Sequence, residues 1–86
     1  MEPIKVNFYR EYLKKHPDFT GCLIDKDNNR LWYKNGKFHR EDGPAIEGAN
    51  GYKAWCLNDR KYDSEQDCKI ALRKIKLENV LKKING

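Results

Sequence analysis

The chain has 86 residues, of which 36% are charged and 38% are hydrophobic, and its formal net charge is +5. A chain of this length buries only about 60–65% of the surface that it exposes when unfolded. This leaves room for one modest core and excludes a two-domain enzyme with a deep interdomain cleft, so we expect a single domain over residues 1–86.

The first predicted element is a helix over residues 3–15. Pro3 suits a first helical turn, and apolar side chains from Ile4 to Leu13 recur on one helical face. A residue that precedes proline is disfavoured in the α region, so His16-Pro17 is expected to end this helix.

Residues 19–62 predict a β-meander. Short apolar runs alternate there with turn dipeptides such as Asn35-Gly36 and Asn50-Gly51. Asn-Gly between apolar runs is a strong hairpin signal, because both central residues of a type I′ turn take positive φ. We expect four to five short antiparallel strands, with the terminal helices covering one face so that the aromatic side chains leave water.

The last predicted element is a helix over residues 64–84. Ser64 is a good N-cap, Glu65 and Asp67 favour the first turn, and the basic pair Lys82 and Lys83 favours the last turn. The predicted fold class is therefore α+β: an antiparallel β-meander flanked by an N-terminal and a C-terminal α-helix.

This last helix has apolar residues on two nearly opposite sides. The first arc consists of Cys68, Ala71, Leu72 and Ile75, and the second arc consists of Leu77, Val80, Leu81 and Ile84. One straight helix cannot bury both arcs against one small sheet. Three outcomes stay open: a bend near Lys76, packing of the second arc on the N-terminal helix, or contact with a second copy or another protein.

The positive charge lies at the two ends of the chain. Residues 1–16 carry +2, residues 17–63 are neutral and residues 64–86 carry +3. Trp32 and Trp55 could offer a base-stacking platform, but a neutral sheet argues against a phosphate track, because electrostatics supplies most non-specific affinity. If nucleic acid is bound, the candidate residues are Arg10, Lys14, Lys69, Arg73, Lys76, Lys82 and Lys83.

The cysteines and the apolar runs bear on compartment and cofactors. Cys22, Cys56 and Cys68 are odd in number and widely spaced, which is untypical of a disulfide framework, and no Cys-x-x-Cys pair occurs. We expect no metal and no other cofactor. Without a signal peptide or a long apolar run, the sequence predicts a cytoplasmic protein with no membrane contact.

A short repeat lies within the meander. Residues 32–37 share with residues 55–60 an aromatic residue, two strand residues, a turn pair and a base. Residues 32–45 resemble the signature Trp-Tyr-x-Asn-Gly-x-x-His-Arg-x-Asp-Gly-Pro-Ala of MORN-like tandem repeats, which are seen in bacteriophage proteins, some bacterial proteins and large DNA viruses. The second copy departs from it, with Asp59 in place of Gly and no His-Arg-x-Asp-Gly-Pro element. The resemblance implies no catalytic activity, and a surface used for contact.

His39, Glu41 and Asp42 invite comparison with an acid-base cluster. Residues this close on one turn do not converge on a point, however, and the sequence places no nucleophile beside them. We favour a structural role, in which Asp42 caps the turn to Gly43 and His39 or Arg40 bonds to a neighbouring strand. No catalytic residue is expected.

These features favour a non-enzymatic protein-interaction module. The resemblance suggests a phage-encoded or phage-derived factor that acts in the host cytoplasm. It would bind and inhibit a host protein with an acidic surface, such as a component of an antiviral defence complex, as an anti-CRISPR-like inhibitor does. The candidate contact residues are Leu77, Val80, Leu81 and Ile84, with a second surface at Trp32, His39, Arg40 and Glu41. The alternatives are a homodimer and a nucleic-acid-binding protein that uses the basic terminal helices.

Overall fold

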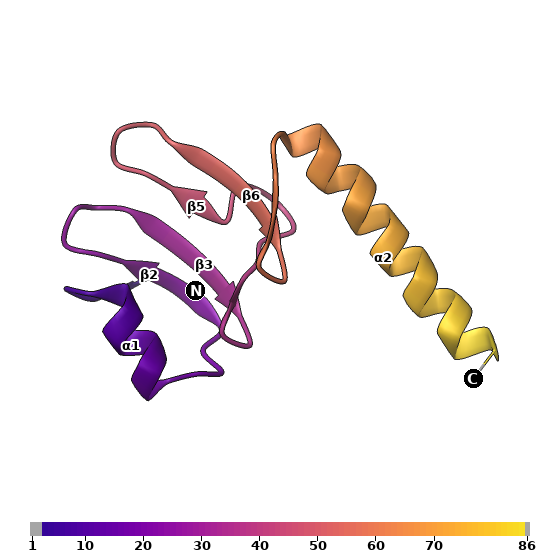
Figure 1. Ribbon diagram of the computed structural model, residues 1–86, viewed down its shortest axis with the longest axis horizontal. Coiled ribbons are helices and arrows are strands. Elements are labelled where there is room, and N and C mark those ends of the chain that lie inside the picture. The colour runs from indigo at the N-terminus through magenta and orange to yellow at the C-terminus, as the bar shows by residue number, and fades with distance from the viewer. Residues whose placement is uncertain (1–2, 86) are drawn as a thin grey trace.

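The computed structural model describes residues 3–85. Within this range the chain forms a seven-stranded sheet and two helices, which confirms the α+β class (Figure 1). In chain order the elements are β1 (Ile4–Lys5), α1 (Tyr9–Lys15), β2 (Gly21–Ile24), β3 (Arg30–Lys34), β4 (Lys37–Phe38), β5 (Ile46–Glu47), β6 (Lys53–Leu57), β7 (Arg60–Tyr62) and α2 (Glu65–Asn85).

The sheet is antiparallel except at its first pair. Its strand order is β1-β2-β3-β5-β6-β7, β4 pairs with β3, and β1 runs parallel to β2. The expected four to five strands are thus too few, because β1 and β4 have only two residues each and give no recognisable apolar run. The Asn35-Gly36 turn between β3 and β4 is confirmed, with positive φ at both residues, and Asn58 and Asp59 take positive φ between β6 and β7. At Asn50-Gly51 only Gly51 has positive φ, so the two positive φ values of a type I′ turn are not present there.

The N-terminal helix begins later than residue 3. Ile4 and Lys5 instead pair with Leu23 and Ile24 of β2, and the N–H of Val6 donates to the carbonyl of Ile24 at 2.8 Å. The apolar residues with helical spacing lie on a helix only from Tyr9 onward. Before it, strand pairing wins because the exposed edge of β2 offers backbone partners that a helix would leave unpaired.

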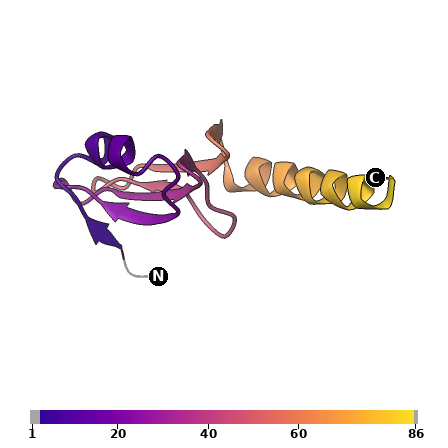
Figure 2. The same ribbon diagram turned by 90° about the horizontal axis from the view of Figure 1, so that it is seen from below.

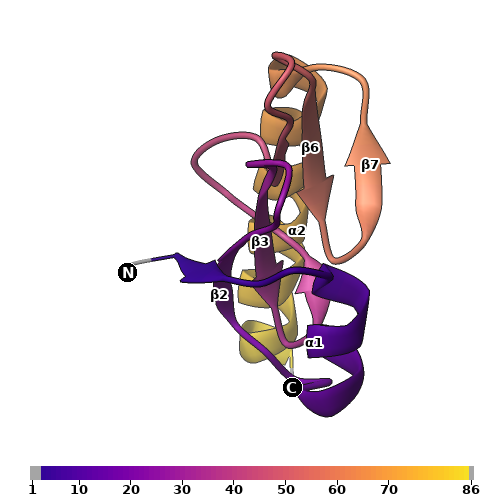
Figure 3. The same ribbon diagram turned by 90° about the vertical axis from the view of Figure 1, so that its left-hand side faces the viewer.

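The core lies between α1 and one face of the sheet (Figures 2 and 3). Leu23, Leu31 and Tyr33 share that face, since alternate strand residues point to the same side, and each is at most 4% exposed. Tyr9 and Leu13 pack against them. A second buried cluster extends the core toward β6 and consists of Ala45, Ala54 and Cys56.

The C-terminal helix begins as predicted but does not cover the sheet. Ser64 Oγ accepts a hydrogen bond from the N–H of Asp67 at 3.1 Å, which confirms the N-cap. Only the first turns pack on β6 and β7, where Cys68 is buried and Ile75 is half-buried. Residues 76–84 are all exposed, and α2 projects from the sheet as one continuous helix (Figures 1 and 2).

Two of the three outcomes left open for this helix are therefore excluded: it does not bend at Lys76, and its second arc does not pack on α1, which lies at the opposite end of the sheet (Figure 1). The physical reason is length. A helix of 21 residues spans about 31 Å, far more than strands of two to five residues can cover. The molecule is accordingly elongated, with dimensions of 46 × 28 × 20 Å.

Candidate interaction surfaces

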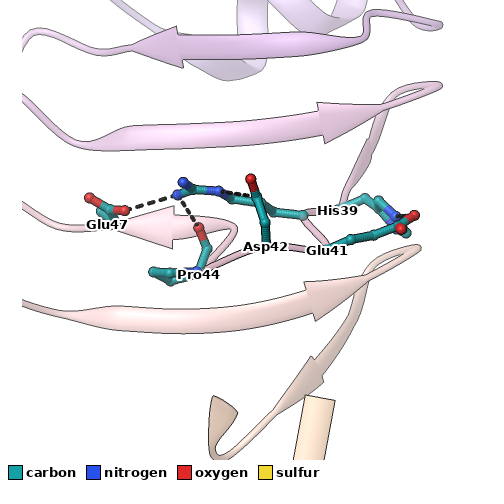
Figure 4. Close-up of polar contacts among 6 residues, drawn as sticks. His39, Glu41, Asp42, Pro44 and Glu47 are labelled. Atoms are coloured by element: carbon teal, nitrogen blue, oxygen red, sulfur yellow. Dashed lines mark hydrogen bonds and ion pairs between the residues drawn. The ribbon is translucent and has the colours of Figure 1, made fainter. Parts of the chain in front are cut away.

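The loop after β4 is organised around the Arg40 side chain. Its Nε donates to Asp42 Oδ1 at 3.0 Å, and its Nη1 donates to the Pro44 carbonyl at 3.1 Å and to Glu47 Oε1 at 3.0 Å. Figure 4 shows Asp42, Pro44 and Glu47 gathered around the guanidinium. A planar guanidinium has the fork of donors that this arrangement needs, so one side chain fixes the whole turn that leads into β5.

The same guanidinium lies over the ring of Trp32, with its carbon 3.9 Å from the ring centroid. This cation–π contact covers one face of the indole, so the face is closed to a stacked base or a partner side chain. Gly43 lies close to it, and a Cβ at Gly43 would come to 3.0 Å from the guanidinium carbon, so a larger residue there would shift the Arg40 side chain by a few tenths of an ångström. Trp32 and Arg40 thus stabilise the loop.

His39 has both ring nitrogens engaged. Nδ1 accepts a hydrogen bond from the N–H of Asn58 at 3.1 Å, so the proton of the neutral ring lies on Nε2, which is 3.1 Å from Glu41 Oε2. This hydrogen bond lowers the pKa of Glu41, and Lys76 adds to the effect. The expected bond from His39 or Arg40 to a neighbouring strand is confirmed for Arg40, which donates to Glu47 of β5, whereas His39 accepts from the turn between β6 and β7. Asp42 was expected to cap the turn to Gly43 and instead accepts a hydrogen bond from Arg40.

The turn of each copy of the short repeat donates a backbone hydrogen bond to the carbonyl of a phenylalanine outside that copy. In the first copy the N–H of Gly36 donates to the carbonyl of Phe19 at 2.9 Å, and in the second the N–H of Asp59 donates to the carbonyl of Phe38 at 2.9 Å. The Asp59 carboxylate also accepts from the N–H of Phe38 at 2.7 Å. The departure from Gly at Asp59 therefore adds a side-chain bond to β4.

The second apolar arc of α2 is exposed, as are its neighbours on the same side. Leu77 is 61%, Val80 52%, Leu81 47% and Ile84 73% exposed. Ile70, on the same side of the helix, is 44% exposed, although it belongs to neither arc of the sequence analysis. We call the exposed set of Ile70, Leu77, Val80, Leu81 and Ile84 the α2 stripe.

A hollow of about 380 Å³ lies beside the start of α2, against β7. Tyr62, Ile70, Ala71 and Lys74 are among the residues that line it. Since Ile70 belongs to both, the hollow adjoins one end of the α2 stripe. It offers a recess to a ligand that lies along the helix.

The basic residues do not form one surface. Arg10 and Lys14 lie on α1, at the far end of the sheet from α2 (Figure 1). The other candidates, Lys69, Arg73, Lys76, Lys82 and Lys83, lie on α2 and are exposed. Two of these have acidic neighbours, with Lys69 Nζ 3.3 Å from Glu65 and Lys76 Nζ 3.7 Å from Glu41.

The remaining chemistry of the described chain is sparse. Among residues 3–85 no three His, Cys, Asp or Glu side chains are grouped to hold a metal ion. Burial raises the pKa of the Cys22, Cys56 and Cys68 thiols, which makes them poor nucleophiles. Neither described helix is long and apolar enough to cross a membrane.

No protein-family model, curated protein or solved structure matches this chain. Ile70 is the contact candidate that the arc pattern missed, and its seven-residue spacing to Leu77 and Ile84 was the signal that could have found it.

Proposed function

We propose that this protein is a non-enzymatic protein-interaction module whose docking element is α2. The observation that carries the proposal is the α2 stripe, an apolar row left in water on a helix that projects from the sheet. Fully burying a Leu or Ile side chain contributes about 1.5–3 kcal/mol. If these residues served only the fold of this protein, they would be buried in its core. Because they are exposed, we expect a bound partner to bury them.

The charge around the stripe favours an acidic protein surface as the partner. From Lys69 to Ile84 the helix has six basic residues and one acidic residue, Glu78. Complementary charge speeds encounter and selects partners, whereas two like-charged helices repel each other. The same charge disfavours the homodimer that the sequence leaves open.

The resemblance to MORN-like repeats supplies the proposed setting. We place the protein among phage-encoded or phage-derived factors that bind and inhibit a host protein, such as a component of an antiviral defence complex. Of the second candidate surface, Glu41 is the exposed member, while His39 and Arg40 are engaged within the loop. The loop after β4 is therefore the secondary contact, and α2 is the primary one.

Nucleic-acid binding is the second candidate function, because five of its seven proposed residues share α2. Affinity that rests on phosphate contacts falls steeply with salt. A duplex or single strand that binds at low salt and is released as salt rises would support this candidate over the first. Arg10 and Lys14 on α1 cannot join the same short site.

A matched pair of α2 variants tests the primary proposal. We expect Leu77→Glu to abolish capture of a stoichiometric host protein, because it places a carboxylate in the middle of the stripe. Asn79→Glu adds the same charge one half-turn away and should leave capture intact. The measurement is affinity capture from nuclease-treated host lysate with both variants beside the unaltered protein. Equal capture by all three, or none by any, contradicts the proposal.

A further inference from the structure

The α2 stripe has the spacing of a coiled-coil seam. Ile70, Leu77 and Ile84 are seven residues apart, and Val80 and Leu81 lie between the last two on the same side. A seven-residue apolar repeat keeps its seam facing a second helix, while a flat sheet or loop does not require that period. The period therefore points to a helix as the occupant of the stripe.

A basic residue precedes each of the three heptad-spaced residues. These are Lys69, Lys76 and Lys83, and all three are exposed. If Ile70, Leu77 and Ile84 take the a positions of a heptad, these lysines take the g positions, which flank the seam and set the choice of partner.

The lysines argue against a second copy of α2. In an antiparallel pair the g positions face each other, and in a parallel pair Lys69 would face the other helix's Lys74. Both arrangements bring like charges together across the seam, which is destabilising. Arg73, at a d position, would add a further positive charge to the seam.

The internal ion pairs of these lysines do not prevent exchange. Lys69 pairs with Glu65 at 3.3 Å and Lys76 with Glu41 at 3.7 Å, and in both pairs each side chain is at least 42% exposed. Exposed pairs of this kind contribute about 0–1 kcal/mol. A partner carboxylate can replace them at little cost.

We propose that α2 pairs lengthwise with one amphipathic helix of another protein, which has an apolar seam flanked by Asp or Glu where it meets Lys69, Lys76 and Lys83. This inference rests on the proposed function and specifies the partner. The seam from Ile70 to Ile84 is about 21 Å long, or two heptads. Isolated helices of that length are marginal in water, so the partner helix belongs to a folded domain or is held helical.

The test uses a designed peptide of about 28 residues, stapled to hold it helical, with Leu and Ile in the seam and Glu at the flanking positions. Its glutamates keep it from pairing with itself. The control peptide has Lys in place of each Glu. We expect fluorescence anisotropy to show the acidic peptide binding at least about tenfold more tightly than the basic one.

Variants of the intact protein locate the binding. Leu77→Glu should weaken the acidic peptide at least about tenfold, and Asn79→Glu should not. The double variant Lys76→Glu with Lys83→Glu should reverse the preference toward the basic peptide, a result that misfolding would not produce. The inference is overturned if neither peptide binds, if both bind equally, or if a DNA duplex binds in their place.

The failure of this inference is distinguishable from the failure of the proposed function. If Leu77→Glu removes a captured host protein but the acidic peptide does not bind, α2 docks on a surface other than a helix. If sedimentation shows the protein to be a dimer that Leu77→Glu dissociates, the occupant is a second copy and the inference is wrong.

Discussion

Replacing Gly36 by alanine is expected to destabilise the fold by about 3 kcal/mol or more. Gly36 lies at the turn between β3 and β4 with φ of +79°, in the left-handed region that disfavours a Cβ. A Cβ would also overlap the Pro17 carbonyl oxygen, which belongs to the backbone and cannot move aside as a side chain can. The loss is measured as the free energy of unfolding in urea.

Gly51→Ala is the matched control for that prediction. Gly51 has φ of +91°, yet no atom of the described residues outside its own neighbours lies within 4 Å of the added Cβ. It should therefore lose only the conformational term of about 1 kcal/mol. If the two variants lose the same stability, the close packing of this turn against Pro17 is not important to the fold.

The second large effect is expected for Arg40→Ala, at about 2 kcal/mol of the free energy of unfolding. The main loss is the charged hydrogen bond to the Pro44 carbonyl, together with the stack on Trp32. The ion pairs to Asp42 and Glu47 add less, because these carboxylates are partly or largely exposed.

Two further substitutions isolate the cause. Arg60→Ala removes a more distant cation–π contact, 5.8 Å from the Tyr62 ring, and should cost less than about 0.5 kcal/mol. Arg40→Lys keeps the charge but loses the fork of donors, so it should fall between the alanine variant and the unaltered protein. If Arg40→Ala lowers the free energy of unfolding by no more than Arg60→Ala does, Arg40 does not stabilise the loop after β4 as proposed.

The sequence predicted best where local chemistry decides the structure. The Asn35-Gly36 turn and the Ser64 cap follow from residue types that favour one local geometry, and both are present. The predicted start of the N-terminal helix was wrong because Ile4 and Lys5 pair with β2, which is distant in the sequence. Helical spacing carries no information about such a partner.

The candidate site shows the same division. The second arc of α2 could be recognised in the sequence because its residues lie nearly opposite the first arc around the helix. In the structure Leu77 and its neighbours are exposed, which is one of the outcomes that this pattern left open. The roles of His39 and Arg40 depend on Asn58 and on Glu47, contacts between segments that a residue pattern cannot bring together. Sequence placed these two side chains on a contact surface, whereas their bonds turn them into the loop.

The free energy of unfolding of Leu77→Glu tests most directly the claim that the α2 stripe lies outside the fold. A side chain that is 61% exposed makes little contribution to the folded state. The variant should therefore unfold within about 0.5 kcal/mol of Asn79→Glu and of the unaltered protein. A loss of about 2 kcal/mol or more for Leu77→Glu alone would mean that the stripe is buried within the free protein, and that α2 is not a docking element.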